Sequence, residues 1–202
     1  MKDEYVQLAQ VYRPEKHFIA GWLMSEKLDG IRFLWDGGVT RGMRVDSIPW
    51  ANTAKDKSIR YASGLWSRYG KTITAPGWWL DQLPDVPLDG EGWTKRDDRQ
   101  SLVSAVKKHT PVDEQWRKVT YKVFDSPAPE QWLKSRTINN QHCKMTIPPH
   151  AIKWYYDHGG KKGIGLNVHV FGRFNTQPGV LELAAQWPLP MMTSDIENEI
   201  RV

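Results

Sequence analysis

The chain has one cysteine, Cys143, among its 202 residues, so it cannot form an internal disulfide. It has no apolar run long enough to span a membrane, and residues 1–5 lack the apolar core of a signal peptide. Its histidines and cysteine do not fall at zinc-site spacings, and the glycine–lysine stretch near residue 160 does not match a P-loop. These absences predict a protein of the reducing cytoplasm without a structural zinc site.

Basic residues outnumber acidic ones by 28 to 23, which gives a net charge of +5. This balance favours a polyanionic partner, either nucleic acid or nucleotide. The basic residues are spread along the chain and form no basic tail. Eleven tryptophans are present, and we expect most of them in the core, although tryptophan also stacks on bases. The length predicts a single domain.

The pattern that organises the chain lies at residues 26–32, Glu-Lys-Leu-Asp-Gly-Ile-Arg. Apolar residues on both sides predict two strands joined by a tight bend, in which Gly30 permits a positive φ. The bend places Lys27 at a strand end, facing a cleft. A lysine amine attacks phosphorus only without its proton, so burial or a neighbouring cation such as Arg32 has to assist. Alone, the pattern also fits a solvated lysine beside a turn.

A second turn signal, Asp-Gly-Gly at residues 36–38, predicts a hairpin whose returning strand covers residues 39–42. That strand would bring Arg41 near Arg32 and Lys27, in the geometry that a triphosphate needs. An exposed hairpin position is the alternative for Arg41.

Residues 76–83 and 99–109 are predicted to be helices, and residues 86–93 and 119–125 are predicted to be strands. The last of these strands alternates, so Phe124 lies on the face opposite Val119, Tyr121 and Val123.

The strand predicted at residues 86–93 carries Asp-Gly-Glu at residues 89–91. A carboxylate there can accept hydrogen bonds from ribose hydroxyls or bind Mg²⁺. A simple turn at residues 89–91 and a buried core position for Phe124 are the alternatives.

Together these patterns resemble the motifs of the covalent nucleotidyltransferases, namely ATP-dependent DNA ligases, RNA ligases and mRNA-capping guanylyltransferases. Residues 27–32 resemble motif I, residues 40–42 motif Ia, residues 88–91 motif III and residues 121–125 motif IIIa. The four motifs follow the family's order, and their sequences are most similar to those of DNA ligases of the bacteriophage type. The resemblance covers the chain up to about Pro127.

The resemblance implies an α+β fold with antiparallel sheets flanked by helices, as in an ATP-grasp-like adenylation domain. It implies that Lys27 attacks the α-phosphorus of ATP to give lysyl-AMP. AMP then passes to a DNA 5′-phosphate and a 3′-hydroxyl seals the nick, in DNA repair, replication or recombination. By the same resemblance, the nucleotide-binding residues and their roles are Glu26 at the adenine edge, Arg32 and Arg41 on ribose or phosphate, Glu91 on ribose or metal, and Phe124 stacked on the base.

The implied cofactors are ATP and Mg²⁺, with Glu91 as the candidate metal ligand. The implied partner is nicked double-stranded DNA, bound by a monomer in the cytoplasm, or in the host cytoplasm if the gene is phage-borne. Motif IV, a Glu-Gly pair, and motif V, a phosphate-contacting lysine pair, are not found after Asp125, and no length remains for an OB-fold domain. We therefore expect residues 1–202 to be the N-terminal portion of an adenylation domain, incomplete at the C-terminus, which alone forms little adduct.

Two alternatives stay open at this stage. The same motifs occur in RNA ligases and capping guanylyltransferases. A comparison of ATP with GTP as the source of the lysine adduct would distinguish a capping guanylyltransferase. The absence of motif V instead favours a non-catalytic protein that binds nucleotide or DNA without forming a covalent adduct.

Overall fold

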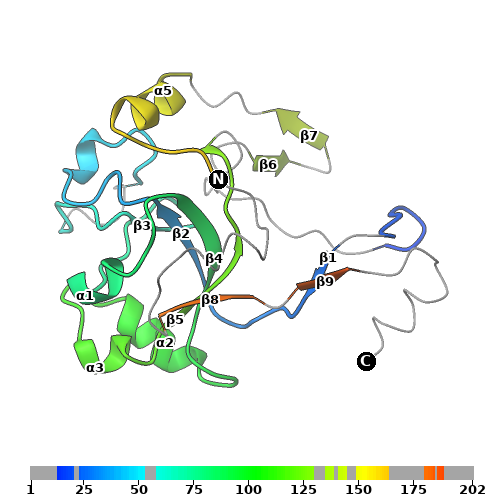
Figure 1. The fold of residues 1–202 in the computed structure, drawn as a ribbon, viewed down its shortest axis with the longest axis horizontal. Helices are drawn as coiled ribbons and strands as arrows, with labels where there is room; N and C mark the ends of the chain where they lie inside the picture. Colours follow the sequence, from blue (N-terminus) through cyan, green and yellow to red (C-terminus); the bar gives the residue numbers. More distant parts are fainter. Residues whose placement is uncertain are drawn as a thin grey trace.

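The computed structural model describes residues 13–20, 23–52, 58–129, 135–138, 141–144, 149–163, 180–184 and 186–188. Its main body is a five-stranded sheet in the order β3-β2-β4-β5-β8 (Figure 1). These strands are β2 (Ile31–Asp36), β3 (Leu65–Ser67), β4 (Pro87–Trp93), β5 (Thr120–Asp125) and β8 (Leu181–Leu183). The predicted α+β class is confirmed, but the sheet is mixed, because β8 runs parallel to β5 while the other neighbours are antiparallel.

The remaining elements are small. Two strand pairs lie outside the main sheet, β1 (Leu23–Ser25) with β9 (Gln186–Pro188) and β6 (Ser135–Ile138) with β7 (Gln141–Lys144). The helices are the 3-10 turn η1 (Val45–Ser47), α1 (Gly77–Leu80), α2 (Arg99–Val106), α3 (Asp113–Trp116) and α5 (Pro149–Asp157). None of the helices in the described part of the chain could cross a bilayer.

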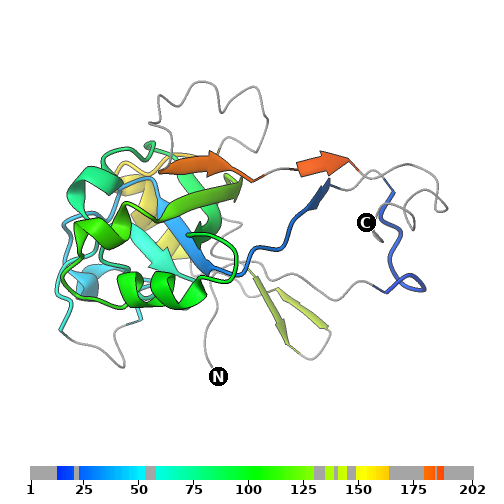
Figure 2. The same ribbon diagram turned by 90° about the horizontal axis from the view of Figure 1, so that it is seen from below.

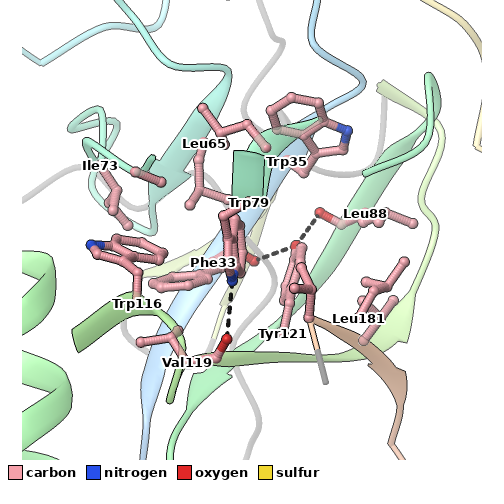
Figure 3. Close-up of a cluster of buried hydrophobic side chains, with 14 of the residues drawn as sticks. Phe33, Trp35, Leu65, Ile73, Trp79, Leu88, Trp116, Val119, Tyr121 and Leu181 are labelled. Atoms are coloured by element: carbon pink, nitrogen blue, oxygen red, sulfur yellow. Dashed lines mark hydrogen bonds between the residues drawn. The ribbon is translucent and has the colours of Figure 1, made fainter. Parts of the chain in front are cut away.

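The helices α1, α2 and α3 pack on one face of the sheet (Figure 1). The centre of this core is aromatic, with Phe33 of β2 and Trp79 of α1 at 6.2 Å between ring centroids, and Trp79 and Trp116 at 5.1 Å (Figure 3). Two polar atoms in the core are satisfied by backbone carbonyls: Nε1 of Trp79 donates to Val119, and the hydroxyl of Tyr121 donates to Leu88 at 2.8 Å. Burial of large rings on this face is what holds the helices to the sheet.

The prediction that most tryptophans are core residues is confirmed where burial is described. Burial is described for eight of the eleven tryptophans, and five of these are buried, namely Trp35, Trp50, Trp66, Trp79 and Trp116. The predicted helices and later strands are also confirmed, as α1, α2, β4 and β5, with α2 ending at Val106 rather than His109. The core could be predicted because each of these patterns is local in sequence.

A second apolar cluster lies on the other face of the sheet, at the end of β2 and beside β3. Leu34 and Trp66 pack there against Trp50 and against Tyr155 of α5. This cluster covers only one end of that face. At the other end of the same face, β2, β4 and β5 carry charged side chains instead.

The predicted hairpin with a third strand over residues 39–42 is wrong. Gly37 and Gly38 have φ of 79° and 81°, as a tight turn requires, but the chain then turns again, with the Arg41 amide donating to the Gly38 carbonyl. Both edges of β2 are already paired, with β3 and with β4, so no edge remains for residues 39–42. The Thr40 hydroxyl also donates to Oδ2 of Asp36, which draws the segment back onto the strand end.

Asp36 is fully buried at the point where β2 ends. Its Oδ2 accepts hydrogen bonds from the Thr40 hydroxyl and, at 2.9 Å, from Nε1 of Trp66. Burial raises the pKa of Asp36 to about 6, and the two hydrogen bonds oppose the rise. The carboxyl group therefore titrates above its ordinary range.

We expect the free energy of unfolding to fall as the pH rises from about 4 to about 6, because folded Asp36 keeps a proton that the unfolded chain has lost. The shift from 3.8 to about 6 corresponds to at most about 3 kcal/mol. The contribution is complete below pH 4 and lost above pH 6. Urea unfolding across this range measures the decline, and Asp36→Asn should diminish it. An undiminished decline in the variant would contradict the assignment.

Candidate functional site

A row of four charged residues crosses the sheet on the face opposite the aromatic core. Arg32 of β2 pairs in register with Glu91 of β4, Glu91 with Lys122 of β5, and Lys122 with Glu182 of β8. Residues directly opposite one another in a sheet share a face. The row therefore alternates in charge, positive and negative, across four adjacent strands.

Arg32 is held by a two-point ion pair and an aromatic ring. Its Nε and Nη2 each donate to an oxygen of Asp89 at 2.5 Å, and its guanidinium carbon lies 4.6 Å from the centroid of Phe124. The Arg32 side chain is 19% exposed and that of Asp89 is 8% exposed. Desolvation raises the pKa of Asp89, and the bonded guanidinium opposes the rise. The pair fixes the guanidinium plane over one face of the Phe124 ring.

Glu91 joins the row to the bend that follows Lys27. Its Oε1 accepts a hydrogen bond from the backbone amide of Gly30 at 3.1 Å. Burial raises the pKa of Glu91 to about 6, and the positive charges of Arg32 and Lys27 oppose this rise. Lys27 therefore lies near enough to Glu91 for its charge to act on that carboxylate.

Gly30 is required for close approach rather than for an unusual dihedral angle. It is not among the glycines with positive φ, which corrects the expectation from the sequence. A Cβ atom at this position would lie 2.6 Å from Cγ of Glu91 and would also overlap the Gly92 carbonyl. Any side chain here would push the bend away from β4 and break the bond to Glu91.

The segment between β1 and β2 is also tied to the connection between β4 and α2. Glu26 forms an ion pair with Arg96 at 2.6 Å, and Asp29 forms one with Arg99 at 3.2 Å. All four side chains are substantially exposed, so each pair contributes little to stability. Their effect is to hold the chain on both sides of Lys27 against one connection.

Arg41 is not brought to this group. It follows the far end of β2, and about 13 Å of strand separates Arg32 from Asp36, where the turns begin. Its Nη1 donates to Oδ1 of Asp81 at 2.6 Å, just after α1. The structure therefore links Lys27, Glu91, Arg32 and Phe124, whereas the Glu26 carboxylate pairs with Arg96 and Arg41 lies apart. The role predicted for Arg41 had depended on the third strand.

Three residues of the site had no role in the sequence analysis: Asp89, Lys122 and Glu182. Asp89 entered the predictions only within the Asp-Gly-Glu run at residues 89–91, and Lys122 only within residues 121–125. The alternation that places Phe124 on one face of that strand places Lys122 on the same face. That shared face was the available signal for Lys122. Glu182 comes from a strand far along the chain, and its place beside Lys122 depends on the parallel pairing of β8 with β5.

The site offers little for a metal ion on its own. Within the part of the chain that the structure describes, no three His, Cys, Asp or Glu side chains lie close enough to hold one. Mg²⁺ commonly binds through one or two carboxylates together with substrate phosphates. The Glu91 carboxylate fits that donor set, as the single protein ligand.

Comparisons with known proteins agree on one class. A DNA ligase of Haemophilus influenzae is 27% identical over 118 residues, which span 58% of this chain and 34% of that protein. A solved structure from "DNA binding with a minimal scaffold: Structure-function analysis of Lig E DNA ligases" matches with a TM-score of 0.56 and 22% identity. The chain's neighbours are DNA ligases. No protein family model matches the chain.

The two matches differ in extent. The structural match covers 97% of this chain and 56% of the Lig E ligase chain, so the chain spans less than two thirds of either relative. At 22% identity the structural likeness establishes the fold. The grouping of Lys27, Gly30, Arg32 and Glu91 is the feature from which a function can be argued.

Proposed function

We propose that this chain is a nucleotidyltransferase of the ATP-dependent DNA ligase type, with Lys27 as the nucleophile. The observation that carries the proposal is the hydrogen bond from the Gly30 amide to Glu91, which joins the lysine bend to a face that also presents Arg32 and Phe124. The similarity to DNA ligases supports the same class. Nicked DNA as substrate, a role in repair or replication, the bacteriophage type and the cytoplasmic location belong to this proposal.

In the proposed reaction, the lone pair of the Lys27 amine attacks the α-phosphorus of ATP. A nitrogen–phosphorus bond forms, the bond to the bridging oxygen breaks, pyrophosphate leaves, and the proton released from the amine passes to water. Glu91 fixes the bend that carries Lys27, and Asp89 fixes the orientation of the Arg32 guanidinium, whose positive charge would attract an oxygen of ribose or phosphate. Bound with the nucleotide, Mg²⁺ would neutralise phosphate charge, with Glu91 as its protein ligand.

The test is transfer of label from the chain to DNA. The chain is incubated with Mg²⁺ and either α-labelled ATP or α-labelled GTP, freed of nucleotide, and then given nicked duplex DNA with a 5′-phosphate. We expect label from ATP only, and its passage to the 5′-phosphate at the nick. Label from GTP would favour a capping guanylyltransferase. Transfer to nicked RNA in preference to DNA would favour an RNA ligase.

Phe124→Ala is expected to weaken ATP binding by about 1–3 kcal/mol, the range for loss of a ring that stacks on a base. One face of the ring lies against the Arg32 guanidinium. Isothermal titration measures the affinity. Tyr69→Ala is the matched control, because Tyr69 also lies beneath an arginine, Arg68, at 4.7 Å, but outside the row of charges.

Tyr69→Ala should leave ATP binding unchanged. If Phe124→Ala instead lowers the melting temperature strongly and leaves the affinity unchanged, Phe124 is a packing residue.

A further inference from the structure

The two cations of the charged row are held in different ways. Arg32 makes two parallel bonds to Asp89, both side chains are largely buried, and a ring lies beneath the guanidinium. Breaking such a pair leaves a buried charge, so its partners are not readily exchanged. Arg32 is therefore a fixed element of the site.

Lys122 is held less firmly. Its Nζ contacts one carboxylate, that of Glu182, and lies 5.3 Å from the ring centroid of Trp93. The Lys122 side chain is 20% exposed, whereas that of Glu182 is 44% exposed. A half-exposed carboxylate can return to water at little cost, and a single ion pair of this kind is weak. Lys122 can exchange its partner while its ammonium group stays over the Trp93 ring.

We infer that Lys122 is a phosphate-binding residue of the proposed nucleotide site, and that Glu182 is an internal anion which polyphosphate displaces from it. Lys122 lies next to Glu91 in the row, and the positive charge of Lys27 acts electrostatically on Glu91. An anion held between Lys27 and the sheet would therefore meet Lys122 as the nearest cation of the row beyond Glu91. The location of the anion rests on the proposed function, but its displacement of Glu182 does not require covalent transfer.

Charge balance gives the reason for the exchange. The row carries two positive and two negative side chains, and Asp89 adds a further negative charge on the same face. Lys27 balances the charge of Asp89, so a triphosphate brought to this face meets no net attraction until a carboxylate withdraws. Glu182 is the member that can leave, because Asp89 is buried against Arg32 and Glu91 holds the Gly30 amide. Its departure frees Lys122 and removes a repulsive charge in one step.

The experiment measures binding of inorganic tripolyphosphate, without nucleotide, by isothermal titration. Glu182→Gln should tighten binding by about fivefold, the scale of a partly exposed ion pair, and Lys122→Gln should weaken it by a similar factor. Combining the two substitutions should abolish the gain, because the gain depends on a freed ammonium. Lys122→Arg should keep most of the affinity of the unchanged protein.

Asp85→Asn is the matched control, since Asp85 pairs with Lys161 away from the row and the variant has the same net charge as Glu182→Gln. It should leave the affinity unchanged. Equal tightening in both variants would reduce the effect to net charge and overturn the inference. The inference would also be overturned if Glu182→Gln lowered the melting temperature but left tripolyphosphate binding unchanged. The pair of Lys122 and Glu182 would then serve only to hold β8 to β5.

A second measurement needs no substitution. Brief acetylation with acetic anhydride, read by mass spectrometry of peptides, reports the access to each lysine. Tripolyphosphate should slow acetylation of Lys122 and leave that of the paired Lys161 unchanged. Equal rates at Lys122 with and without the anion would contradict the inference. Protection of Lys122 by tripolyphosphate, together with label from α-labelled ATP on a residue other than Lys27, would uphold the inference while refuting transfer by Lys27, so the two failures are distinguishable.

Discussion

Asp89→Ala is expected to lower the free energy of unfolding by about 3–5 kcal/mol, the loss typical of breaking a buried ion pair on one side. The substitution removes both acceptors of the Arg32 guanidinium, which lies largely buried between β4 and the Phe124 ring. The unpaired charge has to be desolvated without compensation, and that accounts for most of the loss. Urea unfolding followed by circular dichroism measures it.

Two controls isolate this cause. Asp46→Ala breaks a similar two-point pair with Arg44, but on the surface, and should produce no measurable change. Replacing both partners, as Arg32→Met with Asp89→Leu, should recover much of the stability because no charge is left buried. A loss in Asp89→Ala no larger than that of Asp46→Ala would show that the pair does not organise this face.

Lys27→Arg is expected to reduce covalent labelling by ATP to background. The guanidinium stays protonated in proteins and has no lone pair to offer the phosphorus, although it retains the positive charge. Lys27→Ala should have the same effect on labelling. Because Lys27 is exposed, neither substitution should disturb folding, and circular dichroism would verify this. A gel assay with α-labelled ATP and Mg²⁺ measures the adduct.

Lys95→Arg is the matched control, because Lys95 is also exposed and precedes Arg96, which pairs with Glu26 beside the lysine bend. Labelling of that variant should equal that of the unchanged chain. Labelling that survives Lys27→Arg would assign the nucleophile to another residue.

The elements that could be predicted from the sequence are those set by local patterns. The alternation in residues 119–125 gave β5, and the apolar spacing after Asp98 gave α2. The motif resemblance assigned Lys27 and Glu91 to one nucleotide site, but it did not predict the hydrogen bond between Gly30 and Glu91. The row itself could not be predicted, because a shift in register between Asp89 and Gly90 sets which residue of β5 lies opposite Glu91.

The error over Arg41 has a similar origin. A glycine-rich turn after a strand usually reverses it into a hairpin, but only when an edge of that strand is free. Here β2 pairs with β3 and β4, whose residues come more than 28 positions later, and these non-local pairings prevail. The third strand was the geometric link between Arg41 and the lysine, and without it only the resemblance of residues 40–42 to motif Ia connects that arginine with Lys27.

The most direct test of the central claim is to map where AMP attaches. The 202-residue chain is incubated with α-labelled ATP and Mg²⁺, and the labelled peptide is isolated under basic conditions and sequenced by mass spectrometry. We predict an acid-labile, base-stable adduct, small in yield, on the peptide that contains Lys27 and absent from Lys27→Ala. An adduct on any other residue, or an adduct that survives Lys27→Ala, would contradict Lys27 as the nucleophile.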